Sequence, residues 1–144
     1  MEIELGFGTG VQKLTVPDEN LIGVLRPNPV EHVLTGEAEV RRALMNPIGT
    51  PKLREIVKPG ETVAIVTSDI TRPLPSYKVL PALLDELYAA GVQKEDITIV
   101  FALGSHRKQT PAEQAKLVGE RAFSEVRCVD GDDSDCVHIG ITSR

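Results

Sequence analysis

Two apolar runs separated by an amphipathic segment constrain the fold of this chain most strongly. Residues 62–67 (TVAIVT) and 97–103 (ITIVFAL) are short, continuous and rich in β-branched residues, which is typical of parallel strands buried on both faces. Between them, residues 76–90 place apolar side chains at helical spacing, with Ser76 as the expected cap and Gly91 where helices commonly end. A strand, a helix and a second buried strand predict a right-handed βαβ unit.

The same alternation continues along the chain. Thr110, Pro111 and Glu113 supply the cap, first-turn proline and first-turn acid that open a helix, which we expect to end near Gly119. Residues 125–129 then predict a third strand. The expected fold class is therefore α/β, with a βαβαβ core and a mostly parallel sheet.

The N-terminal part has a different pattern. Residues 2–6 and 11–16 alternate apolar and polar side chains on either side of a glycine-rich turn, which predicts a β-hairpin with one buried face. This hairpin precedes the sheet, and residues 1–144 are expected to form a single domain. Further short elements are predicted at residues 22–25 and 137–141 (strands) and at residues 36–45 and 53–57 (helices).

Composition limits the classes of function. The net charge of −5 and an aromatic content of 3% argue against a nucleic-acid partner, which would need clustered cations and stacking rings. No apolar run approaches the length of a membrane span, and the N-terminus lacks the apolar core of a signal peptide. Cys128 and Cys136 lie too far apart for a Cys-x-x-Cys motif. We therefore expect a cytoplasmic protein without a membrane partner.

Polar residues follow the first buried strand, where an open parallel sheet binds its ligands. Asp69 and Arg72 lie three residues apart, ahead of a segment stiffened by two prolines. An arginine fork suits bidentate binding of a carboxylate or phosphate, and an aspartate beside it can orient the arginine or accept a hydrogen bond from a substrate hydroxyl. On the residues alone, an Asp69–Arg72 pair that only orders the loop is an equally good interpretation.

The loop after the second buried strand carries the remaining candidates. Gly104 and Ser105 are small enough to let a ligand approach the backbone, and His106 could serve as an acid–base group, since histidine is the residue type most often used for proton transfer. A surface histidine bonded within its loop is the competing interpretation. Arg107 and Lys108 are better explained as solvated loop charges. No metal-ligand pattern is found: the acidic turn at 130–135 lacks the glycine and glutamate of a calcium loop.

The two loops together resemble those of the nickel-dependent lactate racemase family of 2-hydroxy-acid racemases and epimerases. In that family a Ser/Asp-x-Thr-Arg-Pro loop is followed, after the next strand, by Gly-Thr/Ser-His-Arg. Residues 68–73 (SDITRP) and 104–107 (GSHR) match this pattern, and the final residues 139–144 are similar as well. The resemblance covers most of the chain but only about the first third of a family member. It implies the N-terminal, substrate-side domain of a larger two-domain racemase, with the C-terminal domain absent.

The resemblance also implies a reaction. Family members interconvert the enantiomers of a lactate-like 2-hydroxy acid by proton abstraction and hydride transfer to a nickel pincer nucleotide derived from a pyridinium mononucleotide, tethered in the absent portion. His106 would be one of two acid/base histidines, Arg72 would bind the substrate carboxylate, Asp69 would orient substrate or cofactor, and Thr71 would line the pocket. The chain alone is expected to be inactive. Two alternatives stay open: a non-catalytic binding domain for a carboxylate or phosphate metabolite, using Arg72 and Arg107, or a structural domain.

Overall fold

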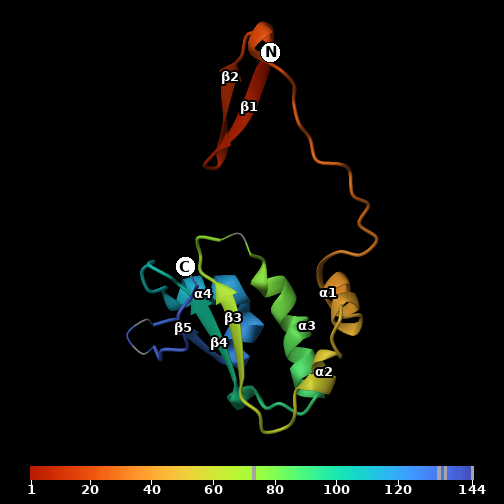
Figure 1. The fold of residues 1–144 in the computed structure, drawn as a ribbon, viewed down its shortest axis with the longest axis vertical. Helices are drawn as coiled ribbons and strands as arrows, with labels where there is room; N and C mark the ends of the chain where they lie inside the picture. Colours follow the sequence, from red (N-terminus) through yellow and green to blue (C-terminus); the bar gives the residue numbers. More distant parts are fainter. Residues whose placement is uncertain (73, 133, 135, 144) are drawn as a thin grey trace. The chain divides into compact units, whose positions relative to one another are not determined.

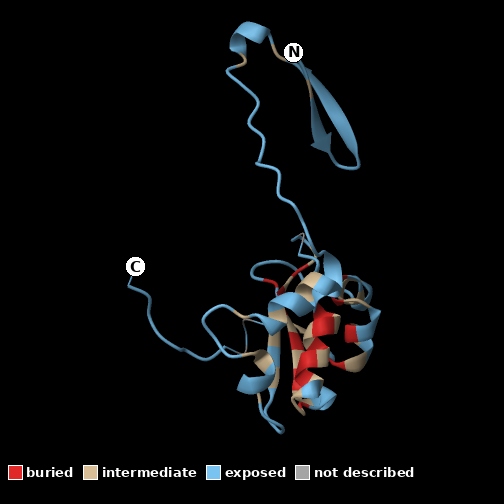
Figure 2. Ribbon diagram, turned by 90° about the vertical axis from the view of Figure 1, so that its right-hand side faces the viewer, coloured by how far each residue is buried: buried red, intermediate tan, exposed pale blue. Residues whose placement is uncertain are grey.

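The computed structural model describes residues 1–72, 74–132, 134 and 136–143. The predicted domain contains two compact units, Met1–His32 and Val33–Arg144 (Figure 1). Among the described residues, buried side chains occur only in the second unit (Figure 2).

The first unit is the predicted hairpin. Strands β1 (Glu2–Phe7) and β2 (Gly10–Thr15) pair antiparallel, with Glu4 opposite Lys13. Because opposite residues share a face, Ile3, Leu5, Phe7 and Leu14 form an apolar face, but Leu5, Phe7 and Leu14 stay at least half exposed within this unit. A 3-10 turn, η1 (Asp18–Asn20), follows.

The strand predicted at residues 22–25 is wrong. The chain from residue 21 to residue 32 forms neither helix nor strand. Ile22 and Leu25 are fully exposed, so no neighbouring strand lies close enough to accept backbone hydrogen bonds. Pro27 and Pro29, which have no N–H group to donate, end the apolar run.

The second unit contains the predicted parallel sheet. Strands β3 (Val63–Ser68), β4 (Ile97–Ala102) and β5 (Arg127–Asp130) lie in the order β3-β4-β5 and all run parallel. The α/β class and the preceding hairpin are therefore confirmed. Ile65 pairs with Ile99, and Ile99 with Cys128 in turn, so these three side chains line one face of the sheet.

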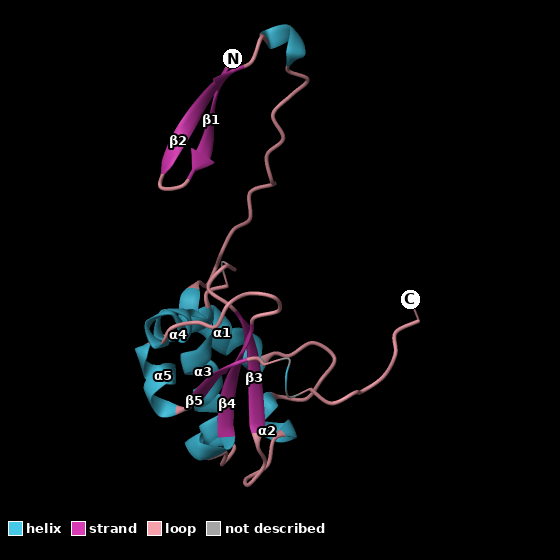
Figure 3. Ribbon diagram, turned by 90° about the vertical axis from the view of Figure 1, so that its left-hand side faces the viewer, coloured by secondary structure: helices cyan, strands magenta, loops and turns pink. Residues whose placement is uncertain are grey.

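Helices cover that face. Helices α3 (Ser76–Ala89), α4 (Pro111–Val118) and α5 (Glu120–Glu125) lie on one side of the strands (Figure 3). Two successive right-handed crossovers in one direction place their helices on the same side, which explains this arrangement. The core between them contains these buried residues: Leu80, Leu84, Leu87, Val92, Ile97, Ile99, Phe101, Leu103, Leu117, Val118, Ala122 and Val126. Helices α1 (Gly36–Met45) and α2 (Leu53–Ile56) pack on the outside of α3, and η2 (Lys94–Asp96) precedes β4.

The opposite face of the sheet is open within this unit. Val66 on β3 is 69% exposed, and Val100 and Val129, its neighbours across the strands, are half-buried. The prediction that the strands are buried on both faces is therefore wrong for β3. An apolar run indicates only that both faces of a strand are suited to burial. Here all three helices that cover the sheet lie on one side of it.

The capping residues observed at the helix ends agree with the predictions only in part. Thr110 and Glu113 form a capping box, with the Thr110 hydroxyl accepting from Glu113 N at 3.3 Å and the Glu113 carboxylate accepting from Thr110 N at 2.9 Å. Ser76 is not a cap, because Pro75 occupies that position and the Ser76 hydroxyl bonds Thr67 at 2.6 Å instead. Gly119 ends α4 as predicted, but the short helix α5 that follows was not predicted.

The final predicted strand is also wrong. Residues 137–141 form no strand, and Val137, Ile139 and Ile141 are 82%, 95% and 90% exposed. The alternating pattern is present, but within the described part of the chain no strand pairs with this segment.

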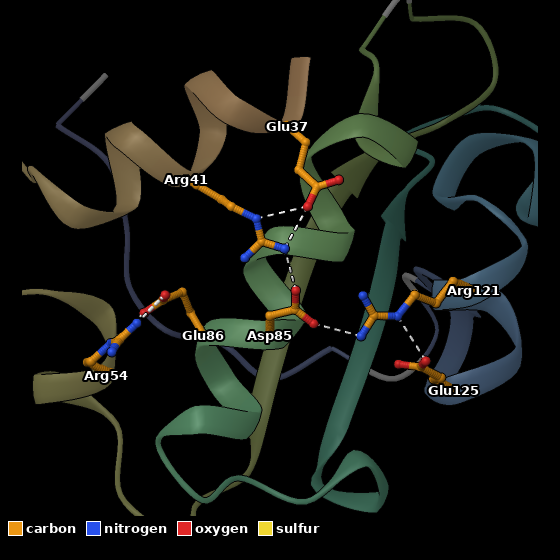
Figure 4. A network of polar contacts seen from close by, with 7 residues as sticks. All are labelled: Glu37, Arg41, Arg54, Asp85, Glu86, Arg121 and Glu125. Atoms are coloured by element: carbon orange, nitrogen blue, oxygen red, sulfur yellow. Dashed lines mark hydrogen bonds and ion pairs between the residues drawn. The ribbon is translucent and has the colours of Figure 1, made fainter. Parts of the chain in front are cut away.

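Ion pairs brace the outer side of α3 (Figure 4). The Asp85 carboxylate accepts from Arg41 of α1 at 2.6 Å and from Arg121 of α5 at 2.7 Å, while Glu86 accepts from Arg54 of α2 at 2.7 Å. Arg121 and Arg41 together lower the pKa of Asp85. These ion pairs link α1, α2 and α5 to α3, in addition to the apolar contacts that α2 and α5 make with the core. In the described part of the chain, no helix has the length and apolar character needed to cross a bilayer.

Candidate functional site

The candidate residues lie where the carboxyl ends of β3 and β4 meet. The two strands are hydrogen-bonded neighbours and point the same way, so the loops that follow them emerge side by side (Figure 1). Asp69 directly follows β3, and its side chain is only 4% exposed. His106 follows β4, and its side chain is 43% exposed. The topology therefore brings together the two residues that the sequence placed on separate loops.

Asp69 is bound within its own loop and across to the next one. Its Oδ1 accepts from the Thr71 amide at 3.0 Å and from the Thr71 hydroxyl at 2.6 Å. Its Oδ2 makes a short contact with His106 Nδ1. The Thr71 hydroxyl first, and His106 second, lower the pKa of Asp69 to about 2. Asp69 is consequently ionised at neutral pH and accepts hydrogen bonds on both oxygens.

The charge of Asp69 settles the proton position on His106. An ionised carboxylate has no hydrogen to donate, so Nδ1 must be the donor. In the neutral ring, Nε2 then carries the free lone pair. The buried carboxylate therefore leaves the outward ring nitrogen available to take up a proton.

A tight turn presents His106 to Asp69. Gly104 adopts φ +57°, and the His106 amide donates to Leu103 O at 3.1 Å. A β-carbon at Gly104 would meet no atom within 4 Å, so backbone conformation rather than space favours glycine there. The glycine that sequence reasoning assigned to ligand access is thus required by the turn.

Arg72 shares a small cavity with these residues. The cavity, of about 230 Å³, is lined by Asp69, Arg72, Ala102, Leu103, Gly104, Ser105 and His106. Its volume lies below the range of about 300–1,000 Å³ that drug-sized ligands occupy, so it suits a small organic acid. Arg72 is exposed, and no hydrogen bond or ion pair joins its guanidinium to another residue in the described part of the chain. The Asp69–Arg72 pair that would merely order the loop is not formed.

The other predicted candidates lie elsewhere. Arg107 is held by both oxygens of Glu113, at 2.9 and 2.7 Å, and Lys108 lies 3.4 Å from Asp132. Both cations are therefore paired with acids rather than simply solvated. Thr71 is not among the residues that line the cavity, because its hydroxyl is turned to Asp69. Its predicted contact with substrate stays a prediction.

Sequence reasoning missed two residues beside this site. Gln109 is almost fully buried, and its side-chain oxygen accepts from the Ile70 amide at 2.9 Å. Asp130, at the end of β5, accepts from the Gln109 amide at 2.8 Å. A glutamine among charged loop residues matches no motif. The only available signal was the position of Asp130, because the third strand of the sheet also ends at this edge.

No metal centre is formed by the residues that the structure describes: nowhere among them do three or more His, Cys, Asp or Glu side chains lie close enough together to hold an ion.

These features define a class: an α/β domain that presents, to one cavity at the strand ends, a carboxylate-bound histidine and an arginine that has no side-chain partner among the described residues. Residues 7–144 match the family described as the lactate racemase N-terminal domain, and the chain belongs to that family.

Individual proteins similar to this chain support the same family membership. A lactate racemase of Thermoanaerobacterium thermosaccharolyticum is 37% identical over 120 residues, which cover 82% of this chain and 28% of that protein. A lactate racemase of Lactiplantibacillus plantarum is 33% identical over 143 residues, covering 96% of this chain and 34% of that protein. A solved structure of the lactate racemase apoprotein from T. thermosaccharolyticum superposes with a TM-score of 0.78 at 34% identity, covering 94% of this chain and 31% of that one. The chain thus spans about a third of its relatives' length.

Proposed function

We propose that this chain forms the substrate-side part of a racemase that interconverts the enantiomers of a lactate-like 2-hydroxy acid, acting together with a C-terminal domain of the same protein. The observation that carries the proposal is the cavity shared by His106, which is held by Asp69, and Arg72, whose guanidinium is bonded to none of the described residues. A 2-hydroxy acid offers a carboxylate and a neighbouring hydroxyl, one group for each of these side chains.

Arg72 binds the carboxylate in this proposal. Arg72 is exposed and lines the cavity, and among the described residues no acid forms an ion pair with its guanidinium. Two parallel N–H donors match the two oxygens of a carboxylate and fix the orientation of the acid as well as its position. The hydroxyl on the adjacent carbon then lies at the histidine.

His106 takes the hydroxyl proton at Nε2. When the proton arrives there, the ring becomes an imidazolium whose Nδ1–H still donates to the Asp69 carboxylate, so the new positive charge lies against a fixed negative one. Asp69 therefore acts as a positioning residue behind the histidine. Sequence reasoning had assigned it to the substrate or cofactor.

The residues that the structure describes do not fit a nickel site, since they contain no cluster of metal-ligating side chains. We propose that the nickel pincer nucleotide implied by the resemblance is bound by the remainder of the protein. No step assigned to Arg72, His106 or Asp69 depends on it. We also propose a cytoplasmic location, on the ground that both cysteines are free.

Titration of the isotope-labelled chain with L-lactate tests the site directly. We expect shifts in the amide signals of Arg72, Gly104 and His106. Arg72→Ala should weaken binding about tenfold or more, because a hydrogen bond to a charged group contributes about 1.5–3 kcal/mol. Arg107→Ala is the matched control, since Arg107 is already held by Glu113. Equal losses in both variants, with inorganic phosphate binding as tightly as lactate, would favour the anion-binding alternative.

The complete protein tests the activity. There, Arg72→Ala should abolish racemisation of L-lactate while leaving the fold intact, and unchanged activity would remove Arg72 from the site. The 144-residue chain alone is predicted not to racemise L-lactate, as followed by chiral chromatography. Appearance of the D-enantiomer with this chain would refute the predicted need for a second domain.

A further inference from the structure

Gln109 lies where the loops after β3 and β4 approach the end of β5. Its side-chain amide is nearly buried, with 9% of the residue exposed. The amide oxygen accepts from Ile70 N at 2.9 Å, and the amide nitrogen donates to Asp130 Oδ1 at 3.2 Å. One side chain therefore links all three strand ends of the sheet.

Asp130 determines which way the Gln109 amide points. Its carboxylate accepts from Gln109 N at 2.8 Å and Gln109 Nε2 at 3.2 Å, and it also accepts from Gln114 Nε2 at 3.1 Å. A carboxylate accepts hydrogen bonds and donates none, so the amide nitrogen must face Asp130. The amide oxygen is consequently left to face the Ile70 N–H, which is a donor. If the Gln109 side-chain amide were flipped, its nitrogen would face the Ile70 N–H and its oxygen would face the Asp130 carboxylate, and both hydrogen bonds would be lost.

The two loops are thereby joined at two points. His106 contacts Asp69, and three residues further along, Gln109 contacts Ile70, the residue after Asp69. A single contact would allow the loops to pivot about it. Two contacts between short segments fix their relative angle as well, and the proton position on His106 depends on that angle through its Nδ1–H bond to Asp69.

We infer that Gln109, oriented by Asp130, is a positioning residue that holds the His106 loop against the Asp69 loop and so keeps the free lone pair of His106 on Nε2. This inference rests on the proposed function and goes beyond it, because Gln109 is not among the residues that line the cavity. It assigns to the end of β5 a part in the site that the two loop motifs do not contain.

Gln109→Met tests the inference, because methionine keeps the length and the apolar stem but removes both amide contacts. Gln114→Met is the matched control: it removes one bond to Asp130 but reaches neither loop. The readout is the ring ¹⁵N shifts of His106 in the 144-residue chain at about pH 8, where an ordinary histidine is neutral. We expect the Nδ1–H form to predominate in the original chain and in Gln114→Met. Gln109→Met should show a clear gain of the Nε2–H form.

An unchanged tautomer in folded Gln109→Met would overturn the inference, and so would equal changes in both variants, since that would trace the effect to Asp130 alone. If Gln109→Met fails to fold, Asp130→Asn replaces it; its amide group no longer dictates the orientation of Gln109, and the Nε2–H form should again increase. The tautomer is measured without substrate. Failure of lactate binding or racemisation therefore refutes the proposed function and leaves this result to be judged separately.

In the complete protein, Gln109→Met should lower kcat about tenfold with little change in KM, because the carboxylate contact of Arg72 is untouched. A rise in KM with kcat unchanged would contradict a positioning role for Gln109.

Discussion

The covered face of the sheet and the edge where its strands end are stabilised in different ways. Between the sheet and helices α3 to α5, side chains such as Leu84 and Phe101 are completely buried and make no polar contact. At the strand ends, Asp69 and Gln109 are almost as buried, yet each is surrounded by hydrogen-bond donors or acceptors. The first region depends on apolar area removed from water. The second depends on a few oriented polar contacts, so a change there should alter chemistry far more than stability.

The largest expected effect comes from His106. In the complete protein, His106→Gln should lower the racemisation rate about 10²- to 10⁴-fold, which is the usual contribution of a general acid or base. Stability of the chain should change by only about 0.5 kcal/mol, because the ring is partly exposed and outside the core. Chiral chromatography and urea unfolding measure the two quantities. A large loss of stability would erase the contrast between the two regions.

Leu84→Ala tests the covered face of the sheet, where we expect a large loss of stability. Leu84 has no exposed surface, so truncation should destabilise the chain by about 2–5 kcal/mol. Val66→Ala on the open face is the matched control, since Val66 is 69% exposed, and it should cost well under about 1 kcal/mol. Both are measured as shifts of the urea midpoint. Similar costs for the two would mean that the open face is covered in solution.

Of these two regions, lowering the pH tests the strand-end region alone, because it protonates carboxylates there and leaves the apolar core unchanged. The pKa of Asp69 is lowered from 3.8 to about 2, so its contribution to stability is complete above pH 3.8 and disappears as the pH falls towards 2. Glu113 and Asp132 have pKa values lowered to about 2 as well, the first chiefly by Arg107 and the second by Ser134. Comparison of the original chain with Asp69→Asn therefore isolates one group. The stability difference between them should shrink between about pH 4 and pH 2; a difference that is constant across that range would contradict the assignment.

The smallest effect is expected on the outer side of α3. Asp85→Asn removes the charge that faces Arg41 and Arg121, but these side chains are a third to a half exposed. Such pairs contribute about 0–1 kcal/mol, less in high salt. Thermal unfolding at low and high salt should show a small loss that disappears as salt is added. A salt-independent loss would indicate a packing role for Asp85 instead.

The sequence predicted best where local pattern and topology agree. The βαβαβ order followed from the apolar runs. The Thr110 cap and the first-turn acid Glu113 could be predicted because these residues lie only three positions apart, and the structure joins them in a capping box. The rule that ligands bind at strand ends then predicted from the sequence alone that Asp69 and His106 lie near one another.

The predictions that were wrong, and the contacts that were missed, depend on which segments lie beside one another in space, and a single sequence does not show this. Residues 22–25 and 137–141 have strand patterns but join neither of the two sheets that the described residues form. The contact between Asp69 and His106 Nδ1 and the link through Gln109 depend on how two loops turn after their strands. Their residues lie 37 and 39 positions apart in the chain, beyond the reach of any local rule.

The turn at Gly104 has a consequence for handedness. The backbone there adopts a φ of +57°, which glycine and D-residues accept and ordinary L-residues resist, although the space around it is open. A site proposed to accept both mirror forms of its substrate is thus shaped at its rim by the one amino acid that has no mirror form. Chemical synthesis with D-alanine at this position should therefore preserve the turn that L-alanine would strain.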